Sequence, residues 1–411
     1  MRIGIFPHPT FLGEVIPALS IGEELKKEGM EVTFLFHRGR YSPLIEEKFS
    51  FVEVPPPYKR EEEIKLHLYH QGRFSFFKPL LTSSRLREFI EGEREVLSSL
   101  HLDAVIMFFQ FTLSISARLL KIPLISVISG TWTAPFFEYA LPPSYIQEKL
   151  PLPLPLSLKK KIFLKRFLSL PAYLKPFNQV AEFYNLPPFF TTLELLSGDL
   201  ALVPEIPEII GVEEDKMSLP VSRGLYWRNY PLHYRYIDPL EKEEGKETEE
   251  NPFEIISLLG SSTGERITRV VYQALATLPH RSLLCLSSPL PSLQDREKLR
   301  VTMGHPSLSL ISRARLLIIT GGRGTVGRVI QTGVPFIGIG IQPEQELRLE
   351  LLARRGAGIR IPLSLLTPSY LRNKIILVLK EIRFRRKAEE LSTLISPGRN
   401  PARIIQKFLK D

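Results

Sequence analysis

Cysteine is almost absent from this chain of 411 residues, which contains a single one, Cys285. One thiol cannot form an internal disulfide, and no cluster of metal-ligating residues surrounds it in the sequence. A disulfide framework is therefore excluded. We expect Cys285 to be a small, buried apolar residue rather than a nucleophile.

Long apolar runs are also missing. A membrane-spanning helix needs about 18 to 20 consecutive apolar residues, and the best candidate, 104–130, is interrupted by Arg118 and Lys121. The first residues, MRIGIF, have the pattern of a strand and lack the apolar region and cleavage site of a secretion signal. We therefore expect a cytoplasmic protein without a spanning helix.

No signature of a DNA- or RNA-binding module accompanies the net charge of +10. Positive charge favours anionic partners, and a nucleotide or an anionic membrane fits this sequence better than nucleic acid does. With 44% hydrophobic and 24% charged residues, the composition is that of a globular protein. The length suits two α/β domains.

The most informative stretch is 316–333, where a strand, a glycine turn and a helix follow one another. Leu316 to Thr320 is a short apolar run, the turn is GGRG (321–324), and a helical pattern runs from Thr325 to Gly333. Glycines let an anion approach backbone N–H groups at the positive end of a helix. The turn therefore predicts a phosphate or diphosphate site.

Similar units flank this stretch. A strand at 336–341 precedes a polar loop with Glu344 and Gln345, and a strand at 253–259 precedes a second glycine- and hydroxyl-rich turn, 260–264. Parallel strands end at one edge of a sheet, where ligands of open α/β folds bind. We expect these loops to open on that edge.

The first half of the chain alternates strands and helices in the same way, which predicts an α/β fold class. The expected strands are 2–6, 31–36, 103–109 and 124–129, and the expected helices are 15–27 and 113–120.

Two stretches interrupt the alternation. The segment from Leu158 to Lys175 mixes apolar residues with a basic cluster, so a helix there suits an anionic membrane surface, or a solvated face packed on its own domain. The cluster consists of Lys159, Lys160, Lys161, Lys165 and Arg166. Residues 238–252 are too charged and too weakly apolar to order themselves, which predicts a linker or exposed loop between domains.

With these residues placed, the chain resembles the family 1 glycosyltransferases of GT-B fold, in particular bacterial enzymes that use nucleotide sugars to glycosylate macrolides and other apolar acceptors. The donor-domain signature is matched in order and spacing by Thr320-Gly321-Gly322, Gly324-Thr325, Arg328, Gly333-Val334-Pro335, Glu344-Gln345 and Gly356-Ala357-Gly358. Further family segments are resembled by Gly13 to Pro17, Asp199 to Pro204, Gly224 to Trp227 and Leu259 to Ser261. The resemblance covers nearly the whole chain.

The resemblance implies two Rossmann-like domains facing a central cleft, with a C-terminal helix that crosses back to the N-terminal domain. Its boundaries would be 1–237 for the acceptor-binding domain, 238–252 for the linker, 253–385 for the donor-binding domain and 386–411 for the crossing helix. The implied activity is inverting, metal-independent transfer of a hexose from a UDP- or dTDP-sugar to a hydroxyl of an apolar or lipid-like acceptor. No cofactor is implied, since the nucleotide sugar is a co-substrate.

The resemblance also implies the donor site. The diphosphate would be held by Gly260, Ser261, Ser262, Thr320, Gly321, Gly322, Arg323, Gly324 and Thr325, while Arg328, Glu344 and Gln345 would contact the sugar or nucleoside. Three positions depart from the family pattern. Thr320 replaces a histidine, Arg328 replaces a ribose-binding carboxylate, and Phe108 or Phe109 replaces the aspartate that orients a catalytic histidine.

Acceptor and catalytic groups are predicted less directly. Phe108, Phe109 and Trp132 lie in aromatic-rich segments near strand ends, which suit either an apolar acceptor pocket or the core. Glycosyl transfer needs a base for the acceptor proton. Glu14 stands where the family carries its catalytic histidine and is the predicted base, with His8 as the second candidate. A helix N-terminus also favours a carboxylate on its own, so a purely local role of Glu14 stays open.

Other interpretations of the glycine turn stay open. Residues 322–327, GRGTVG, satisfy the dinucleotide fingerprint, which would indicate a nicotinamide or flavin enzyme. The turn could also be structural, with no ligand. The three departures favour a further alternative, a glycosyltransferase-like protein that has lost catalysis and binds or assists a partner.

Overall fold

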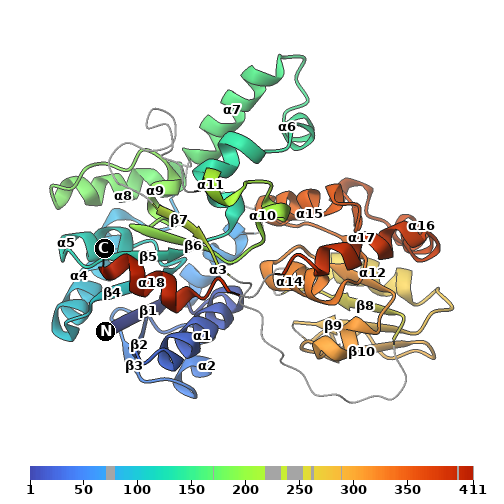
Figure 1. The fold of residues 1–411 in the computed structure, drawn as a ribbon, viewed down its shortest axis with the longest axis horizontal. Coiled ribbons are helices and arrows are strands. Elements are labelled where there is room, and N and C mark those ends of the chain that lie inside the picture. The colour runs from blue at the N-terminus through green and yellow to red at the C-terminus, as the bar shows by residue number, and fades with distance from the viewer. Residues whose placement is uncertain are drawn as a thin grey trace. The chain divides into compact units, whose positions relative to one another are not determined.

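The computed structural model describes residues 1–70, 79–169, 171–217, 233–237, 253–260, 263–287, 289–395 and 398–410. The chain divides into two compact units, the first comprising Met1–Leu240 with Pro397–Asp411 and the second Glu241–Ser396. Each unit is built on one parallel sheet (Figure 1). The expected linker, 238–252, and the segment Gly224 to Trp227 lie outside the described residues.

The sheet of the first unit has the strand order β3-β2-β1-β4-β5-β6-β7. Its strands are β1 (Arg2–Pro7), β2 (Glu31–Phe36), β3 (Phe51–Glu53), β4 (Ala104–Phe108), β5 (Leu124–Val127), β6 (Leu200–Val203) and β7 (His233–Tyr236). All neighbours pair in parallel. Ile3 and Ile5 belong to one core cluster and Phe6 to another, because alternate side chains of a strand point to opposite faces.

Helices cover both faces of this sheet. On one face, α1 (Leu12–Lys27) and α18 (Pro401–Lys410) share a core cluster that contains Leu19 and Ile405. On the other face, α4 (Ser83–Leu100) and α5 (Leu113–Leu119) contribute Leu97 and Leu113. Figure 1 shows α18, in red, on the first unit, where it contacts α1. The return of the C-terminal helix to the N-terminal unit is therefore confirmed.

The remaining helices of this unit are short or lie beyond the sheet. They are α2 (Pro43–Glu46), α3 (Arg60–His70), η1 (Gly130–Trp132), η2 (Phe136–Ala140), α6 (Pro143–Lys149), α7 (Leu156–Leu168), α8 (Pro171–Phe183), α9 (Thr192–Leu196), α10 (Pro207–Ile210) and α11 (Glu214–Met217). Among the described residues, no helix has both the length and the apolar character needed to cross a bilayer.

The sheet of the second unit has the order β10-β9-β8-β11-β12-β13, again all parallel. Its strands are β8 (Ile255–Leu258), β9 (Ser282–Leu286), β10 (Leu299–Met303), β11 (Leu316–Ile319), β12 (Phe336–Gly338) and β13 (Gly358–Arg360). Cys285 is fully buried in β9, as expected, and burial raises the pKa of its thiol to about 12. Its thiolate is therefore strongly disfavoured.

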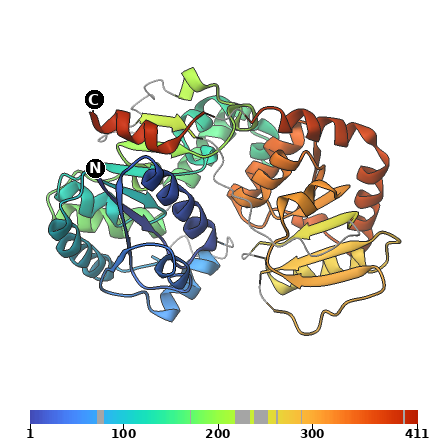
Figure 2. The same ribbon diagram turned by 60° about the horizontal axis from the view of Figure 1, so that its bottom comes forward.

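The helices of the second unit flank its sheet (Figure 2). They are α12 (Glu265–Leu275), α13 (Leu308–Ser312), α14 (Arg323–Thr332), α15 (Pro343–Arg354), η3 (Leu363–Leu365), α16 (Pro368–Lys380) and α17 (Ile382–Ser392). Helices α12 and α16 pack together over one core cluster, and α17 packs on α14. The stretch 386–411, expected as one crossing helix, is thus divided between α17 in the second unit and α18 in the first.

Both sheets contain a point where the direction of strand succession reverses. The chain moves outward from β1 to β3 and continues at β4 on the other side of β1, and it moves from β8 to β10 and continues at β11. Ligands of open parallel sheets bind at the carboxyl ends of the strands at such switch points. The edges between β1 and β4 and between β8 and β11 are therefore the places to search for a site.

Candidate functional site

The switch point of the second unit brings two loops together. The Gly260 N–H, after β8, donates to Thr320 Oγ1, after β11, at 3.3 Å. The Ser287 hydroxyl donates to the Gly260 carbonyl at 3.2 Å. Thr320 is almost fully buried, so its hydroxyl oxygen ties the two loops to each other. Ser261 and Ser262, also predicted for this site, lie outside the described residues.

Gly321 is held in a conformation and a space that only glycine fits. Its φ of +77° lies in the left-handed region, and a Cβ there would lie 2.6 Å from Leu349 Cγ and 2.8 Å from the Gln345 carbonyl oxygen. Its own carbonyl accepts a 2.7 Å hydrogen bond from Arg348 Nη1. Helix α15, which carries these three partners, therefore fixes the turn from one side.

Gly322 is different, because it faces open space. It caps α14 with a φ of −60° and a ψ of 149°, and within 4 Å a Cβ there would meet only Thr325 Oγ1, at 3.8 Å. The first turn of α14 contains Arg323, Gly324 and Thr325 and no acidic residue. The first N–H groups of a helix have no partner within the helix and carry partial positive charge. The open end of this turn is therefore suited to an anion, and diphosphate binding there stays a prediction.

The residues predicted to contact sugar or nucleoside have protein partners. The Gln345 side-chain oxygen accepts from the N–H groups of Ile341 and Gln342 at 3.0 and 3.2 Å, completing a capping box at the start of α15. The Glu344 carboxylate pairs with Arg348. Arg328 donates from Nη1 to the Pro306 carbonyl at 2.9 Å. The sugar- and nucleoside-binding roles of these three side chains stay predictions.

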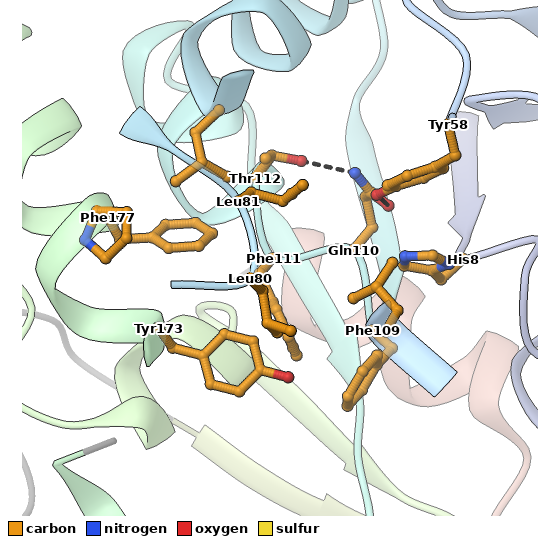
Figure 3. Close-up of a pocket in the computed structure, with 13 residues that line it drawn as sticks. His8, Tyr58, Leu80, Leu81, Phe109, Gln110, Phe111, Thr112, Tyr173 and Phe177 are labelled. Carbon is orange, nitrogen blue, oxygen red and sulfur yellow. Dashed lines mark hydrogen bonds between the residues drawn. The ribbon is translucent and has the colours of Figure 1, made fainter. Parts of the chain in front are cut away.

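The switch point of the first unit holds a pocket. It spans about 440 Å³ when the adjoining open solvent is included, and its lining is mostly apolar and aromatic (Figure 3). The walls come from the ends of β1, β3 and β4 and from helices α3, α4 and α8. The lining residues are His8, Tyr58, Leu66, Leu80, Leu81, Leu86, Phe109, Gln110, Phe111, Thr112, Tyr173, Pro176 and Phe177.

His8 forms the polar end of this pocket together with Tyr58. The two rings stack with centroids 4.6 Å apart (Figure 3). The Phe11 ring lies 5.0 Å from the His8 ring. The His8 backbone N–H donates to the Phe108 carbonyl at 3.0 Å, which fixes the loop after β1 to β4. The Tyr58 hydroxyl donates to Gln110 Oε1 at 3.2 Å. Burial raises the pKa of the Tyr58 phenol, so Tyr58 remains a neutral donor.

A buried polar network supports this end of the pocket. Its centre is the carboxylate of Glu93, on α4, which is 0% exposed. It accepts from Gln110 Nε2 at 3.1 Å, from the Ser116 hydroxyl at 2.5 Å and from the Thr112 hydroxyl, and His37 Nε2 lies 3.1 Å away. Gln110 and Thr112 line the pocket, so Glu93 fixes two side chains of the pocket wall.

The structure brings only part of the predicted first-unit site together. Phe109 and His8 line the pocket, whereas Phe108, the last residue of β4, is fully buried in the core. The chain leaves the strand at Phe109, whose φ is +61°. Trp132 lies in η1 and Glu14 in the first turn of α1, and neither belongs to the lining. Among the described candidates, His8 rather than Glu14 therefore faces the pocket.

Sequence reasoning missed the network and most of the lining. One signal was available for Glu93. Leu86, Phe89, Ile90 and Leu97 mark the apolar face of a helix, and Glu93 falls on that face at the same spacing. A carboxylate at such a position must be paired when it is buried. No comparable local signal marks Tyr58 or Gln110.

No protein-family model matches the chain. A PGL/p-HBAD biosynthesis glycosyltransferase of Mycobacterium tuberculosis (strain ATCC 25177 / H37Ra) is 25% identical over 356 residues, which cover 82% of this chain and 75% of that protein. A PGL/p-HBAD biosynthesis rhamnosyltransferase of Mycobacterium bovis (strain BCG / Pasteur 1173P2) is 24% identical over 332 residues, covering 78% and 69%.

Solved structures show the same fold at lower sequence identity. The spinosyn forosaminyltransferase SpnP superimposes with a TM-score of 0.66 and 16% identity over 100% of both chains. The spinosyn rhamnosyltransferase SpnG, in complex with thymidine diphosphate, gives 0.64 and 14% over 99% of this chain and 100% of that one. The resemblance found in the sequence is confirmed: the chain has the GT-B fold, and its relatives in sequence are glycosyltransferases.

Proposed function

We propose that this protein transfers a hexose from a UDP- or dTDP-sugar to a hydroxyl of an apolar or lipid-like acceptor, with inversion and without a metal ion. The observation that carries the proposal is the glycine turn at the second switch point, where Gly322 leaves the positive end of α14 open to a diphosphate. The structural neighbour SpnG is known in complexes with thymidine diphosphate and with spinosyn aglycone. These complexes support a donor and an acceptor of the proposed kinds.

The pocket of the first unit is the proposed acceptor site. Its aromatic walls, with Phe109, Phe111 and Tyr173, suit an apolar molecule, and its polar end offers His8 to a hydroxyl. In the reaction, the acceptor oxygen forms a bond to the anomeric carbon while the bond to the diphosphate breaks. The diphosphate leaves with the electron pair, and a base takes the acceptor proton.

His8 and Glu14 are the two candidate bases, and the pocket lining favours His8. Substituting the base should lower turnover by roughly 10²–10⁴-fold without changing donor affinity. We therefore expect His8→Gln to show this loss and Glu14→Gln to show much less. A larger loss of turnover in Glu14→Gln than in His8→Gln would identify Glu14 as the base, which is what the sequence alone predicts.

Thermal unfolding with a panel of nucleotides tests the proposed function. UDP, dTDP, their hexose derivatives and NAD would each be added to the purified protein. A ligand present at 100 times its dissociation constant adds about 2.7 kcal/mol to the unfolding free energy. We expect stabilisation by a nucleoside diphosphate or its sugar. Stabilisation by NAD alone, or by no nucleotide, would contradict the proposal.

A second candidate function is nucleotide-sugar binding without transfer. The departures from the family pattern at Thr320, Arg328 and Phe108 favour it, because the residues that the family carries there serve the donor site and the catalytic histidine. Mass spectrometry of apolar acceptors after incubation with a stabilising donor separates the two functions. Transfer predicts an acceptor heavier by one hexosyl residue, which is a hexose less one water, and binding without transfer predicts no change in mass. For either function, we propose that the protein works in the cytoplasm, at the inner face of the membrane.

A further inference from the structure

Helices α6 and α7 form a hairpin that stands away from the sheet of the first unit (Figure 1). Its inner side is packed. Tyr145 of α6 is buried and meets the Phe163 ring at a right angle, with centroids 6.0 Å apart. Leu164 and Leu168 of α7 are also buried. The hairpin is therefore a defined structural element with an inner and an outer face.

The outer face exposes aliphatic side chains. Leu152, in the turn between the helices, is 47% exposed, and Leu156, Leu158 and Ile162 of α7 are 40%, 44% and 37% exposed. Leu158 and Ile162 are four residues apart and share one stripe of the helix. Single exposed leucines need no explanation, but a group of them on one element marks an interaction surface.

Lysines accompany this apolar group. Lys161 and Lys165 are exposed and follow Leu158 by three and seven residues, so they lie along the same stripe. Lys160 is partly buried and donates to the Glu138 carbonyl at 3.1 Å. Helix α7 contains no acidic residue, LSLKKKIFLKRFL being its complete sequence. The outer face is thus apolar and cationic at once.

We propose that this outer face docks on a bilayer that contains anionic lipids, through Leu152, Leu156, Leu158, Lys161, Ile162 and Lys165. The charge selects a negatively charged partner, and aliphatic side chains between lysines match the boundary of acyl chains and anionic headgroups. The inference concerns binding and does not depend on sugar transfer. The pocket belongs to the same unit, because α8, the next helix after α7, contributes Tyr173, Pro176 and Phe177 to it.

Sedimentation with vesicles tests this surface in the full-length protein. Neutral phosphatidylcholine vesicles would be compared with vesicles containing phosphatidylserine, at low and high salt. One variant, Leu158→Gln/Ile162→Gln, removes the apolar stripe, and another, Lys161→Gln/Lys165→Gln, removes charge. Excess inorganic phosphate, added as a competitor, distinguishes a lipid surface from a simple phosphate site.

The chain offers a matched control on the second unit. Ile376 and Lys380 are exposed on α16 at the same spacing of four residues, so Ile376→Gln/Lys380→Gln changes the same chemistry elsewhere. Exposed substitutions of this kind leave the fold intact, which circular dichroism would verify for each variant.

We expect the native protein and the control to bind phosphatidylserine vesicles equally. The apolar-stripe variant should bind about tenfold more weakly at every salt concentration. The lysine variant should lose on the order of tenfold at low salt and show a flatter salt dependence. Equal binding by all four proteins, an equal loss in the control, or full competition by phosphate would overturn the proposal.

Discussion

Between β8 and β11 the sheet edge presents mainly backbone and glycine, whereas between β1 and β4 it presents side chains. At the β8/β11 edge, Gly321 adopts a left-handed conformation against α15, and Gly322 leaves the N-terminal end of α14 open. At the β1/β4 edge, aromatic side chains line the pocket, and the buried carboxylate of Glu93 holds the polar ones in place. A small anionic group suits the first edge, and an apolar molecule suits the second.

The two edges should therefore fail in different ways. A backbone site tolerates few changes at its glycines and many around them. A pocket made of side chains depends on the contacts that orient those side chains. Substitutions at each edge, with a neighbouring position as control, make this difference measurable.

The largest effect should come from the buried network of the first unit. Glu93→Ala removes the acceptor for Gln110, Thr112 and Ser116 and leaves His37 without its carboxylate. A buried donor that loses its acceptor costs about 1–3 kcal/mol, and three donors are affected here, so the total loss should exceed about 3 kcal/mol. Urea unfolding should show this loss in free energy, while Glu95→Ala, on the exposed side of the same helix, should change it by less than about 0.5 kcal/mol. A similar small change in both variants would show that the network does not hold the unit together.

A smaller loss should come from the glycine turn of the second unit. Gly321→Ala places a Cβ within 2.8 Å of Leu349 and of the Gln345 carbonyl and strains a φ of +77°. We expect a cost of about 2–4 kcal/mol, from the left-handed backbone together with overpacking.

Gly322→Ala is the control for this prediction, because its Cβ meets only one atom, at 3.8 Å. Its unfolding free energy in urea should stay within about 1 kcal/mol of the native value. Comparable losses in the two alanine variants would contradict the distinction between a closed and an open side of the turn.

The smallest effect should come from Arg328, whose guanidinium donates to the Pro306 carbonyl. Arg328→Glu removes that bond and restores the carboxylate that the resemblance associates with ribose binding. One hydrogen bond of about 0.5–1.5 kcal/mol corresponds to a change of roughly two- to tenfold in the preference for ribose over deoxyribose nucleotides. Calorimetric affinities for UDP and dUDP would measure it, and an unchanged ratio would show that Arg328 lies outside the nucleoside site.

The glycine turn could be predicted from the sequence because it is formed by residues that are close together in the chain. The glycine turn lies within ten residues of one strand and one helix, so strand, turn and helix 316–333 are all visible in local patterns and confirmed. The expected strands at 2–6, 31–36, 103–109 and 124–129 are likewise confirmed as β1, β2, β4 and β5. Long apolar strands and glycines at helix ends act locally, which is why they can be predicted.

The pocket could not be predicted in this way. Tyr58 and Gln110 are 52 residues apart in sequence and meet only because β3, β1 and β4 lie in one sheet. The resemblance also assigns Gln345 to the sugar, although its place three residues after Gln342 puts it at the capping position of α15. Tertiary contacts of this kind follow from sheet order and register, which single-sequence patterns do not contain.

The central claim, a diphosphate-binding turn at Gly322, is tested most directly by calorimetric titration of UDP and dTDP into two isosteric variants. Both Gly322→Asp and Gly322→Asn place a good N-cap residue at an open position, so both should fold as the native protein does. Only aspartate adds a negative charge beside the phosphates. We predict that one of the diphosphates binds the native protein, and that it binds the aspartate variant about a hundredfold more weakly than the asparagine variant. Equal affinities for the two variants, or no binding of either diphosphate to the native protein, would contradict the account.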